Sequence, residues 1–177
     1  MYLVGKNLER LVEQKGICDV SLVDDFSLTV KLGSKFFRPV KSGEKTIHYG
    51  YQSAMDEFFE EENPDGELSL NPGDSILACS QDQFSIPPGY IGFLFTKGTL
   101  ARMFVSLTAN DPQIEPGFSG FITMELTNHS PWTIDLLLGS KVGQLYIAYC
   151  SNSHSSYNGR YSEAAKEGPT LPILKND

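Results

Sequence analysis

The first sixteen residues carry a helical pattern of hydrophobic and polar positions. Apolar side chains recur there at spacings of three and four residues, which places them on one face of a helix, and a glycine follows as a stop signal. The apolar positions are Leu3, Val4, Leu8, Leu11 and Val12, and the stop is Gly16. The pattern predicts a short amphipathic N-terminal helix.

From residue 67 onward the pattern changes to short apolar runs separated by turn sequences rich in Gly, Pro and Asn. Alternation is clearest where Ile122, Met124 and Leu126 share one face of an extended segment and polar residues take the other. Several short strands spaced by about 8–12 residues are typical of an all-β sandwich or barrel. The predicted strands span residues 68–70, 75–80, 84–86, 90–96, 101–108, 121–128, 132–138 and 142–149.

Two polar stretches stand apart from this strand pattern. Residues 44–68 are acidic, with three glutamates in a row at 60–62, and we expect a solvated loop or hairpin there rather than a metal site. Residues 151–177 are rich in Ser, Asn and Gly and predict a mobile tail, of the kind that can close over a ligand. With this tail included, residues 1–177 are predicted to form a single domain.

Charge and length narrow the possible partners. The chain has 177 residues, a length typical of one domain, and its 14 Lys and Arg against 22 Asp and Glu give a net charge of −8. An acidic chain is a poor partner for duplex nucleic acid or an anionic membrane, because both need a basic surface. No window approaches the about 18 consecutive apolar residues of a membrane helix, and residues 1–16 lack the apolar run of a signal peptide. We therefore expect a cytoplasmic protein that binds neither nucleic acid nor membrane.

Cysteine and histidine are sparse and scattered. The cysteines are Cys18, Cys79 and Cys150, without a CxxC pair, and the three histidines stand alone. An odd number of dispersed cysteines predicts reduced thiols rather than a disulfide framework. Neither a structural zinc site nor a zinc-deaminase signature is expected, and no nucleophile–base pair is visible.

Candidate chemistry remains in three places. Residues 97–102 put two cations, a hydroxyl and a flexible glycine close together, which suits either a phosphate cradle or an ordinary surface turn. Glu125 lies mid-strand, where it is either a solvent-facing structural residue or, inside a pocket, a base whose pKa is raised by desolvation. Glu115 begins a turn, and Tyr157 and Arg160 of the tail could stack on a base and meet a phosphate. Residue type alone leaves these alternatives open.

Five segments between residues 67 and 170 form an ordered set: NPGDSILACS, IPPGYIGFLFTKGTLAR, IEPGFSGFITMELTN, GSKVGQLYIAY and YNGRY. Together they resemble the dCTP deaminase family, within the superfamily of trimeric dUTPases. The N-terminal helix and SLTVKLGSKF match the opening of that family more loosely. Arg102 and Glu125 are 23 residues apart, which is the family's spacing between its active-site arginine and its catalytic glutamate.

This resemblance implies both a fold and an activity. The fold would be mainly β, a distorted β-barrel or jelly-roll of the dUTPase-like type with a short N-terminal helix and a mobile C-terminal tail. The chain would assemble as a homotrimer with each site at a subunit boundary. Deoxycytidine triphosphate and Mg²⁺ would bind there, the metal held mainly by phosphates and waters, and water would replace the 4-amino group without zinc. The leading hypothesis is conversion of dCTP to dUTP and ammonia.

The resemblance also implies a role for individual residues. Glu125 would be the general base that activates water and returns the proton to the pyrimidine, and Arg102 would organise the site. Glu115 stands where the family has an aspartate that faces the sugar. No residue is expected to ligate a metal directly. The nucleotide-binding residues implied are Lys97, Gly98, Thr99, Leu100, Ala101, Arg102, Glu115, Thr123, Met124, Glu125, Gln144, Tyr157 and Arg160.

Several positions depart from the family pattern. Gly98 replaces a serine whose hydroxyl orders the catalytic residues and water, Glu115 replaces aspartate, and Thr29 stands where an early strand has aspartate. Asp111 adds a carboxylate, which would repel a triphosphate. Two alternatives therefore stay open. One is a pyrophosphatase of the dUTPase type, alone or combined with deamination, in which Glu115 activates water at the α-phosphate. The other is a nucleotide-binding regulatory protein without turnover.

Overall fold

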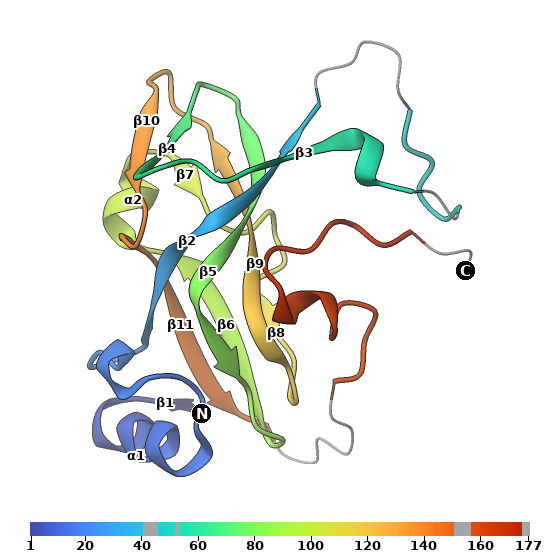
Figure 1. Cartoon of the computed structure of the whole chain (residues 1–177). Helices are drawn as coiled ribbons and strands as arrows, with labels where there is room; N and C mark the ends of the chain where they lie inside the picture. The colour runs from blue at the N-terminus through green and yellow to red at the C-terminus, as the bar shows by residue number, and fades with distance from the viewer. Residues whose placement is uncertain (41–45, 52–53, 151–156, 175–177) are drawn as a thin grey trace.

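The computed structural model describes residues 1–40, 46–51, 54–150 and 157–174, and strands dominate this part of the chain (Figure 1). The strands are β1 (Tyr2–Leu3), β2 (Leu28–Pro39), β3 (Phe59–Glu62), β4 (Glu67–Leu70), β5 (Ser75–Ser85), β6 (Tyr90–Thr96), β7 (Val105–Ser106), β8 (Gln113–Ile114), β9 (Ser119–Asn128), β10 (Ile134–Leu137) and β11 (Lys141–Tyr149). Between them lie the helices α1 (Gly5–Lys15) and α2 (Gly98–Arg102), and the 3-10 turns η1 (Val20–Leu22), η2 (Asp56–Phe58) and η3 (Ala164–Lys166). The prediction of a mainly β fold is confirmed.

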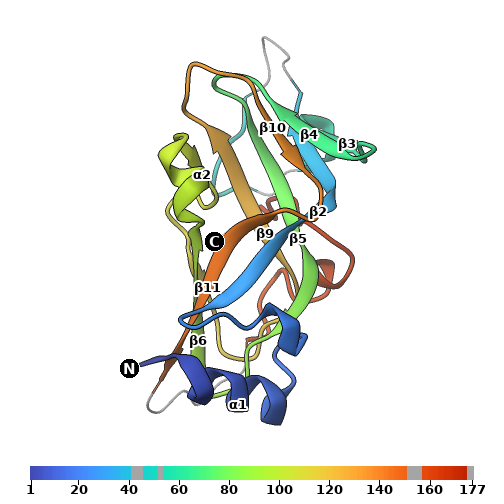
Figure 2. The same ribbon diagram turned by 90° about the vertical axis from the view of Figure 1, so that its left-hand side faces the viewer.

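One large antiparallel sheet organises the fold. In the described ranges it contains nine strands, with the order β7-β9-β5-β2-β11-β6-β8 along its main path, while β1 pairs with β11 and β3 with β2. Strands β4 and β10 form a separate antiparallel pair. Figures 1 and 2 show the long strands twisting into a curled wall, with α1 at one end and α2 toward the other. This curled sheet agrees with the distorted barrel that the sequence predicts.

Helix α1 confirms the predicted amphipathic N-terminus. Leu8, Leu11 and Val12 are buried on its inner face. The helix ends where Gly16 adopts a left-handed conformation with φ 63°, and the Gly16 N–H donates to the Val12 carbonyl at 2.8 Å. Glycine is favoured at such an end because it has no Cβ. Leu3, which the pattern placed in the helix, lies before it in β1 and pairs with β11.

Strand β9 confirms the predicted alternation. Ile122, Met124 and Leu126 are buried, whereas Thr123 and Glu125 on the opposite face are half-buried. The buried face joins one continuous hydrophobic core, to which α1, β2, β5, β6 and β11 also contribute. Strand β9 therefore has one face in the core and presents polar side chains on the other.

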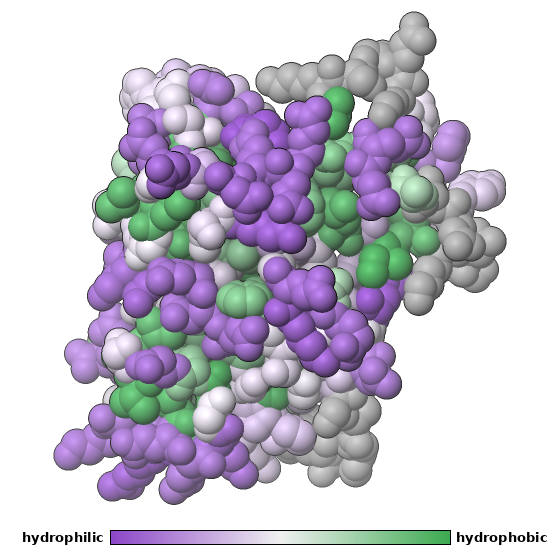
Figure 3. Space-filling view, viewed as in Figure 1, coloured by the Kyte–Doolittle hydropathy of each residue, from purple (hydrophilic) through white to green (hydrophobic). Residues whose placement is uncertain are grey.

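The outer surface is mixed in polarity. On the face drawn in Figure 3, hydrophilic residues cover most of the coloured surface, and the apolar residues between them form several separate patches. Among the described residues, neither helix has the length and apolar composition needed to cross a membrane. The apolar side chains on this face are thus dispersed between polar ones.

Residues 101–108 do not form the predicted strand. The N–H of Ala101 donates to the Lys97 carbonyl at 2.9 Å, which places Ala101 and Arg102 in α2. The chain then turns through Phe104, whose φ is 59° and whose N–H donates to the Ala101 carbonyl at 3.0 Å. Only β7 is extended in this stretch. A tight turn reverses the chain here, so a continuous strand cannot form.

The two strands predicted at 75–80 and 84–86 are largely one strand, β5, which contains a bulge. Its register against β9 shifts between Cys79 and Gln83. Ser80 fills the irregular part: its Oγ donates to the Asp82 carbonyl at 2.7 Å and accepts from the Ile122 N–H at 2.9 Å. A buried side chain therefore replaces the backbone pairing that a bulge interrupts.

The acidic stretch 44–68 is only partly within the described residues, and its second half contains a strand as well as an exposed connection at residues 63–66. Strand β3 pairs with β2 in the large sheet, rather than with a neighbour in the same stretch. Glu62 accepts a hydrogen bond from Arg38 Nε at 2.7 Å, and Arg38 Nη1 donates to Asp74 Oδ2 at 3.0 Å. The prediction of an exposed loop is therefore wrong for β3, which is a strand of the large sheet, but it is confirmed for residues 63–66.

Residues 157–174, here called the C-terminal segment, lie beside β9 (Figure 1). Ala165 of this segment is buried. The Thr170 N–H donates to Thr123 Oγ1 at 3.0 Å, and the two threonine hydroxyl oxygens are 3.1 Å apart. The rest of the predicted tail, residues 151–156 and 175–177, lies outside the described residues, and the mobility of the tail stays a prediction.

A substitution at Gly120 tests how tightly the C-terminal segment packs. Gly120 has φ 150°, and a methyl group placed on it would lie 2.5 Å from the Ala165 carbonyl oxygen. We expect G120A to displace the segment and to lower the free energy of unfolding by about 1–3 kcal/mol. Thermal denaturation measures the loss, and limited proteolysis beyond residue 157 reports the displacement.

The matched control is G66A. Gly66 also has a positive φ, 88°, but no atom lies within 4 Å of the position its Cβ would take. G66A therefore measures the loss of stability that comes from placing alanine at a positive φ, without a steric clash of the added methyl group. Equal proteolysis of the C-terminal segment in both variants would contradict the packing.

Candidate active site

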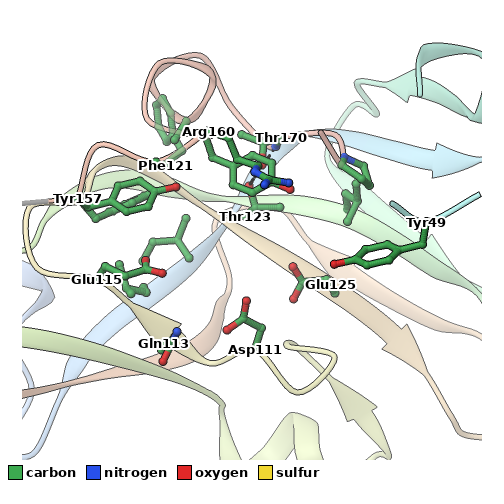
Figure 4. A pocket seen from close by; sticks show the side chains of 18 residues that line it. Tyr49, Asp111, Gln113, Glu115, Phe121, Thr123, Glu125, Tyr157, Arg160 and Thr170 are labelled. Carbon is green, nitrogen blue, oxygen red and sulfur yellow. Dashed lines mark hydrogen bonds between the residues drawn. The ribbon is translucent and has the colours of Figure 1, made fainter. Parts of the chain in front are cut away.

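A cavity of about 660 Å³ opens between β9, the chain that leads into β8, and the C-terminal segment (Figure 4). Its volume is in the usual range for a small-molecule site. The side chains labelled in Figure 4 that line it are Tyr49, Asp111, Gln113, Glu115, Phe121, Thr123, Glu125, Tyr157, Arg160 and Thr170. The predicted residues that the fold brings together here are Glu115, Thr123, Glu125, Tyr157 and Arg160.

Glu125 faces this cavity from the outer side of β9. Its Oε2 accepts a hydrogen bond from the Ala109 N–H at 3.4 Å. Burial raises the pKa of the Glu125 carboxyl above its ordinary value of 4.5, and the negative charge of Asp111 raises it further. The Ala109 N–H opposes part of this effect. A carboxylate with a raised pKa is suited both to accept a proton from water and to return it.

Tyr157 and Arg160 extend the wall formed by the C-terminal segment. The Tyr157 N–H donates to the Pro116 carbonyl at 2.6 Å, and the Tyr157 ring centroid lies 6.4 Å from that of Phe118. Burial raises the pKa of the Tyr157 hydroxyl, so it remains a neutral hydrogen-bonding group at physiological pH. Arg160 Nη1 donates to the Ile173 carbonyl at 3.0 Å, within the C-terminal segment.

The charge of the lining is negative. Among the described residues that line the cavity, the carboxylates of Asp111, Glu115 and Glu125 face a single guanidinium, that of Arg160. Like charges within one site raise each other's energy. A polyanionic ligand therefore needs cations that this lining does not supply.

The predicted phosphate segment, residues 97–102, does not line the cavity. It forms α2 and the residue before it, on a different side of the sheet from the C-terminal segment (Figure 1). Arg102 is exposed, and its Nη1 donates to the Gly98 carbonyl at 3.1 Å, while Leu100 is buried. Arg102 and Glu125, which the sequence spacing links, therefore lie on separate surfaces of one chain.

Met124 and Gln144 do not line the cavity either. The Met124 side chain is 0% exposed in the core, although its backbone adjoins that of Glu125 on β9. Gln144 lies on β11 opposite Thr29 of β2, and its Nε2 donates to Ser27 Oγ at 3.4 Å. Gln144, Thr29 and Ser27 thus form a second group of polar residues in the sheet, separate from the cavity.

Tyr49, Gln113 and Thr170 line the cavity but were not selected from the sequence. The Tyr49 hydroxyl points toward Glu125 in Figure 4, from a segment distant in the chain whose place depends on tertiary contacts. Gln113 precedes Glu115 by two residues, and residues two apart share a face of an extended chain. That spacing is the one sequence signal that could have found it.

The carboxylates of the cavity do not make a metal cage. In the part of the chain that the structure describes, no group of three or more His, Cys, Asp or Glu side chains is placed to hold a metal ion. Mg²⁺ commonly keeps several waters and binds through substrate phosphates instead. The residues present therefore fit Mg²⁺ only as an ion carried by a phosphorylated ligand.

The region that contains the sheet and the β9 side of the cavity matches a known family, and the C-terminal segment lies beyond the match. The model of the dCTP deaminase-like family matches residues 2–150. The chain belongs to the dCTP deaminase-like family. The resemblance carried by the ordered sequence segments is thereby confirmed, and the match includes both α2 and β9.

Named relatives share about a third of their residues with this chain. The protein named dCTP deaminase, dUMP-forming, of Corynebacterium glutamicum (strain R) is 33% identical over 158 residues, which cover 86% of this chain and 82% of that protein. Its namesake from Mycobacterium tuberculosis is 34% identical over 157 residues, covering 87% and 82%. The dCTP deaminase of Natronomonas pharaonis is 28% identical over 152 residues, covering 85% and 78%. The first two names give dUMP as the product, and the third states no product.

A solved structure confirms the fold. The 2'-deoxycytidine 5'-triphosphate deaminase from Agrobacterium tumefaciens superposes with a TM-score of 0.64 over 84% of this chain, at 18% identity. This chain spans about half, 48%, of the length of that one. At this identity the likeness concerns the fold, and it agrees with the dUTPase-like barrel predicted from the sequence.

The variant E125Q tests the burial of the Glu125 carboxylate. The pKa of Glu125 in the folded chain lies above the ordinary value of 4.5. Between these two pKa values the folded chain binds more protons than the unfolded chain. The stability of the wild type therefore falls as pH rises from the ordinary pKa to the raised one. Glutamine does not ionise, so the stability of E125Q does not fall for this reason. We therefore expect the Tm of E125Q minus that of the wild type to grow as pH rises from about 4 to about 7.

Thermal denaturation across this pH range measures the difference. The control is E13Q, because Glu13 lies on the exposed face of α1. A Tm difference for E125Q that is as flat with pH as that of E13Q would show that ionising Glu125 has no cost in the folded protein.

Proposed function

We propose that this chain is a hydrolase that deaminates dCTP at C4 of the cytosine, with Glu125 as the general base. The observation that carries the proposal is the half-buried Glu125 carboxylate, whose pKa is raised and which faces a cavity of about 660 Å³. Membership of the dCTP deaminase-like family and the names of the relatives support the choice of substrate. We propose that this reaction proceeds without zinc, because the sequence lacks the HxE and PCxxC signature of the zinc deaminases.

In this reaction Glu125 takes a proton from a water molecule as that water adds to C4 and forms the C4–O bond. Glu125 then gives the proton to N3, which leaves a tetrahedral C4 bearing a hydroxyl and an amino group. Transfer of the hydroxyl proton to the amino nitrogen breaks the C4–N bond and releases ammonia, and the ring becomes uracil. A raised pKa suits Glu125 to both of its transfers, because it lies closer to working pH than that of an ordinary glutamate.

We propose dUMP and pyrophosphate as the final products. The sequence alone favoured dUTP, but two of the relatives described above are named dUMP-forming. Glu115 lies toward Tyr157 in the cavity, while Glu125 lies toward Tyr49 (Figure 4). A second carboxylate at a different place along the ligand is suited to direct another water to the α-phosphate, which forms a new P–O bond as pyrophosphate leaves.

We further propose that the site is completed in a homotrimer by α2 of a neighbouring copy. The cavity lining is acidic, whereas the exposed Arg102 lies on another surface of its own chain. Lys97 and Arg102 from a second copy would supply the cations that a triphosphate requires. Mg²⁺, bound through the phosphates, would neutralise further charge.

Product analysis of the wild type and E125Q tests the chemistry. With dCTP and Mg²⁺, chromatography of the wild-type reaction should show dUMP and pyrophosphate. E125Q should lose at least about 10²–10⁴-fold in deamination, because an amide cannot accept the proton, yet should still bind dCTP in calorimetry. Accumulation of dUTP alone would overturn the pyrophosphate step, and nucleotide binding without any product would favour a regulatory protein.

Mixing two inactive variants tests the composite site. R102A and E125Q should each be inactive, but co-refolded trimers should regain activity wherever an R102A copy supplies Glu125 and an E125Q copy supplies Arg102. For random 1:1 mixing, about a quarter of the sites combine both wild-type residues, as follows from a head-to-tail ring. Mixing without refolding is the control. If activity does not recover although subunit exchange is verified, the composite site is wrong: Arg102 and Glu125 then do not act in one site built from two copies.

A further inference from the structure

Asp111 is held at the cavity by an anchored turn between β7 and β8. On one side of it the Ala109 N–H donates to Glu125 at 3.4 Å, and on the other the Pro112 carbonyl accepts a backbone hydrogen bond from β6 at 2.7 Å. Asn110 has φ 90°, a left-handed conformation in which asparagine is enriched. Pro112 restricts the residue before it to extended conformations. The backbone therefore fixes the direction of the Cα–Cβ bond of Asp111 at the edge of the cavity.

The Asp111 carboxylate faces the space in front of Glu125 (Figure 4). Within the described ranges no group donates a hydrogen bond to it or pairs with it, and Arg160, the cation of the lining, donates to a backbone carbonyl of its own segment instead. A second carboxylate beside Glu125 makes ionisation of Glu125 less favourable. Asp111 is an exposed residue where it lines this cavity, so water solvates its carboxylate until a ligand with hydrogen-bond donors takes the place of that water.

The substituent on C4 of the pyrimidine is the ligand group that the proposed chemistry brings to this end of the cavity. In cytosine it is an amino group, which offers N–H donors, and in uracil it is a carbonyl oxygen, which only accepts. An ionised carboxylate also only accepts. Asp111 is therefore complementary to the 4-amino group and repels the 4-carbonyl oxygen.

We propose that Asp111 determines specificity by accepting a hydrogen bond from the 4-amino group of the cytosine nucleotide and disfavouring the uracil nucleotide. This inference rests on the proposed function, because it requires C4 to lie beside Glu125. It places the charge of Asp111 at the base rather than at the phosphates, where the sequence alone suggested that it would repel the substrate.

Calorimetry with the α,β-imido analogues of dCTP and dUTP, in the presence of Mg²⁺, tests this preference. The analogues resist release of pyrophosphate, and the E125Q background blocks deamination. We expect E125Q to bind the cytosine analogue more tightly than the uracil analogue. Adding D111N should reduce the ratio of the two Kd values by about 10-fold or more, because a charge-assisted hydrogen bond is lost and an amide can donate to the carbonyl.

The matched control is E115Q in the same background, which removes the same charge from the same lining. It should shift the affinities of both analogues together and leave their ratio unchanged. D111S, a second uncharged variant, should reduce the ratio as D111N does. An unchanged ratio in D111N and D111S, or an equal change in E115Q, would overturn the inference. Failure of the proposed function is seen separately, as absence of deaminated product from wild-type protein.

Discussion

The register between β9 and β5 is the constraint on which both the core and the candidate site depend. Backbone pairing places Glu125 opposite Leu77 and Met124 opposite Ala78. Because side chains alternate between the faces of a strand, a slip by one residue would carry Glu125 into the core and Met124 out of it. Burial of Met124 therefore selects the same register that presents Glu125 to the cavity, so hydrophobic packing positions this carboxylate.

The acidic cavity gathers like charges that do not stabilise the empty fold. Asp111 and Glu115 flank the short strand β8 and Glu125 lies on β9, and none of them contributes to the hydrophobic core. Gathering like charges opposes folding, whereas donors and counter-ions from a bound nucleotide and a neighbouring copy would offset it. The bulk of the sheet supplies the stability that such an arrangement requires.

Local sequence patterns predicted local structure well, and long-range placement poorly. The alternation around Met124 and the stop at Gly16 each depend on near neighbours, and both predictions are confirmed. Helix α2 has five residues, too few for a helical period to show, so its apolar surroundings were interpreted as a strand. The family resemblance identified Glu125, which lines the cavity. It could not indicate Tyr49, whose position depends on how a distant segment folds back, nor that Arg102 lies on another surface of the chain.

The docking of the C-terminal segment sets an order of events during synthesis. The ribosome makes the chain from its N-terminus, so the last strand of the sheet is complete at Tyr149 before Thr170 exists. Thr170 donates a hydrogen bond to Thr123, which lies 47 residues earlier in the chain and two residues before Glu125. All residues of the hydrophobic core precede residue 150, whereas one wall of the cavity comes from residues that follow it. The order of synthesis therefore separates the residues that build the core from those that enclose the cavity.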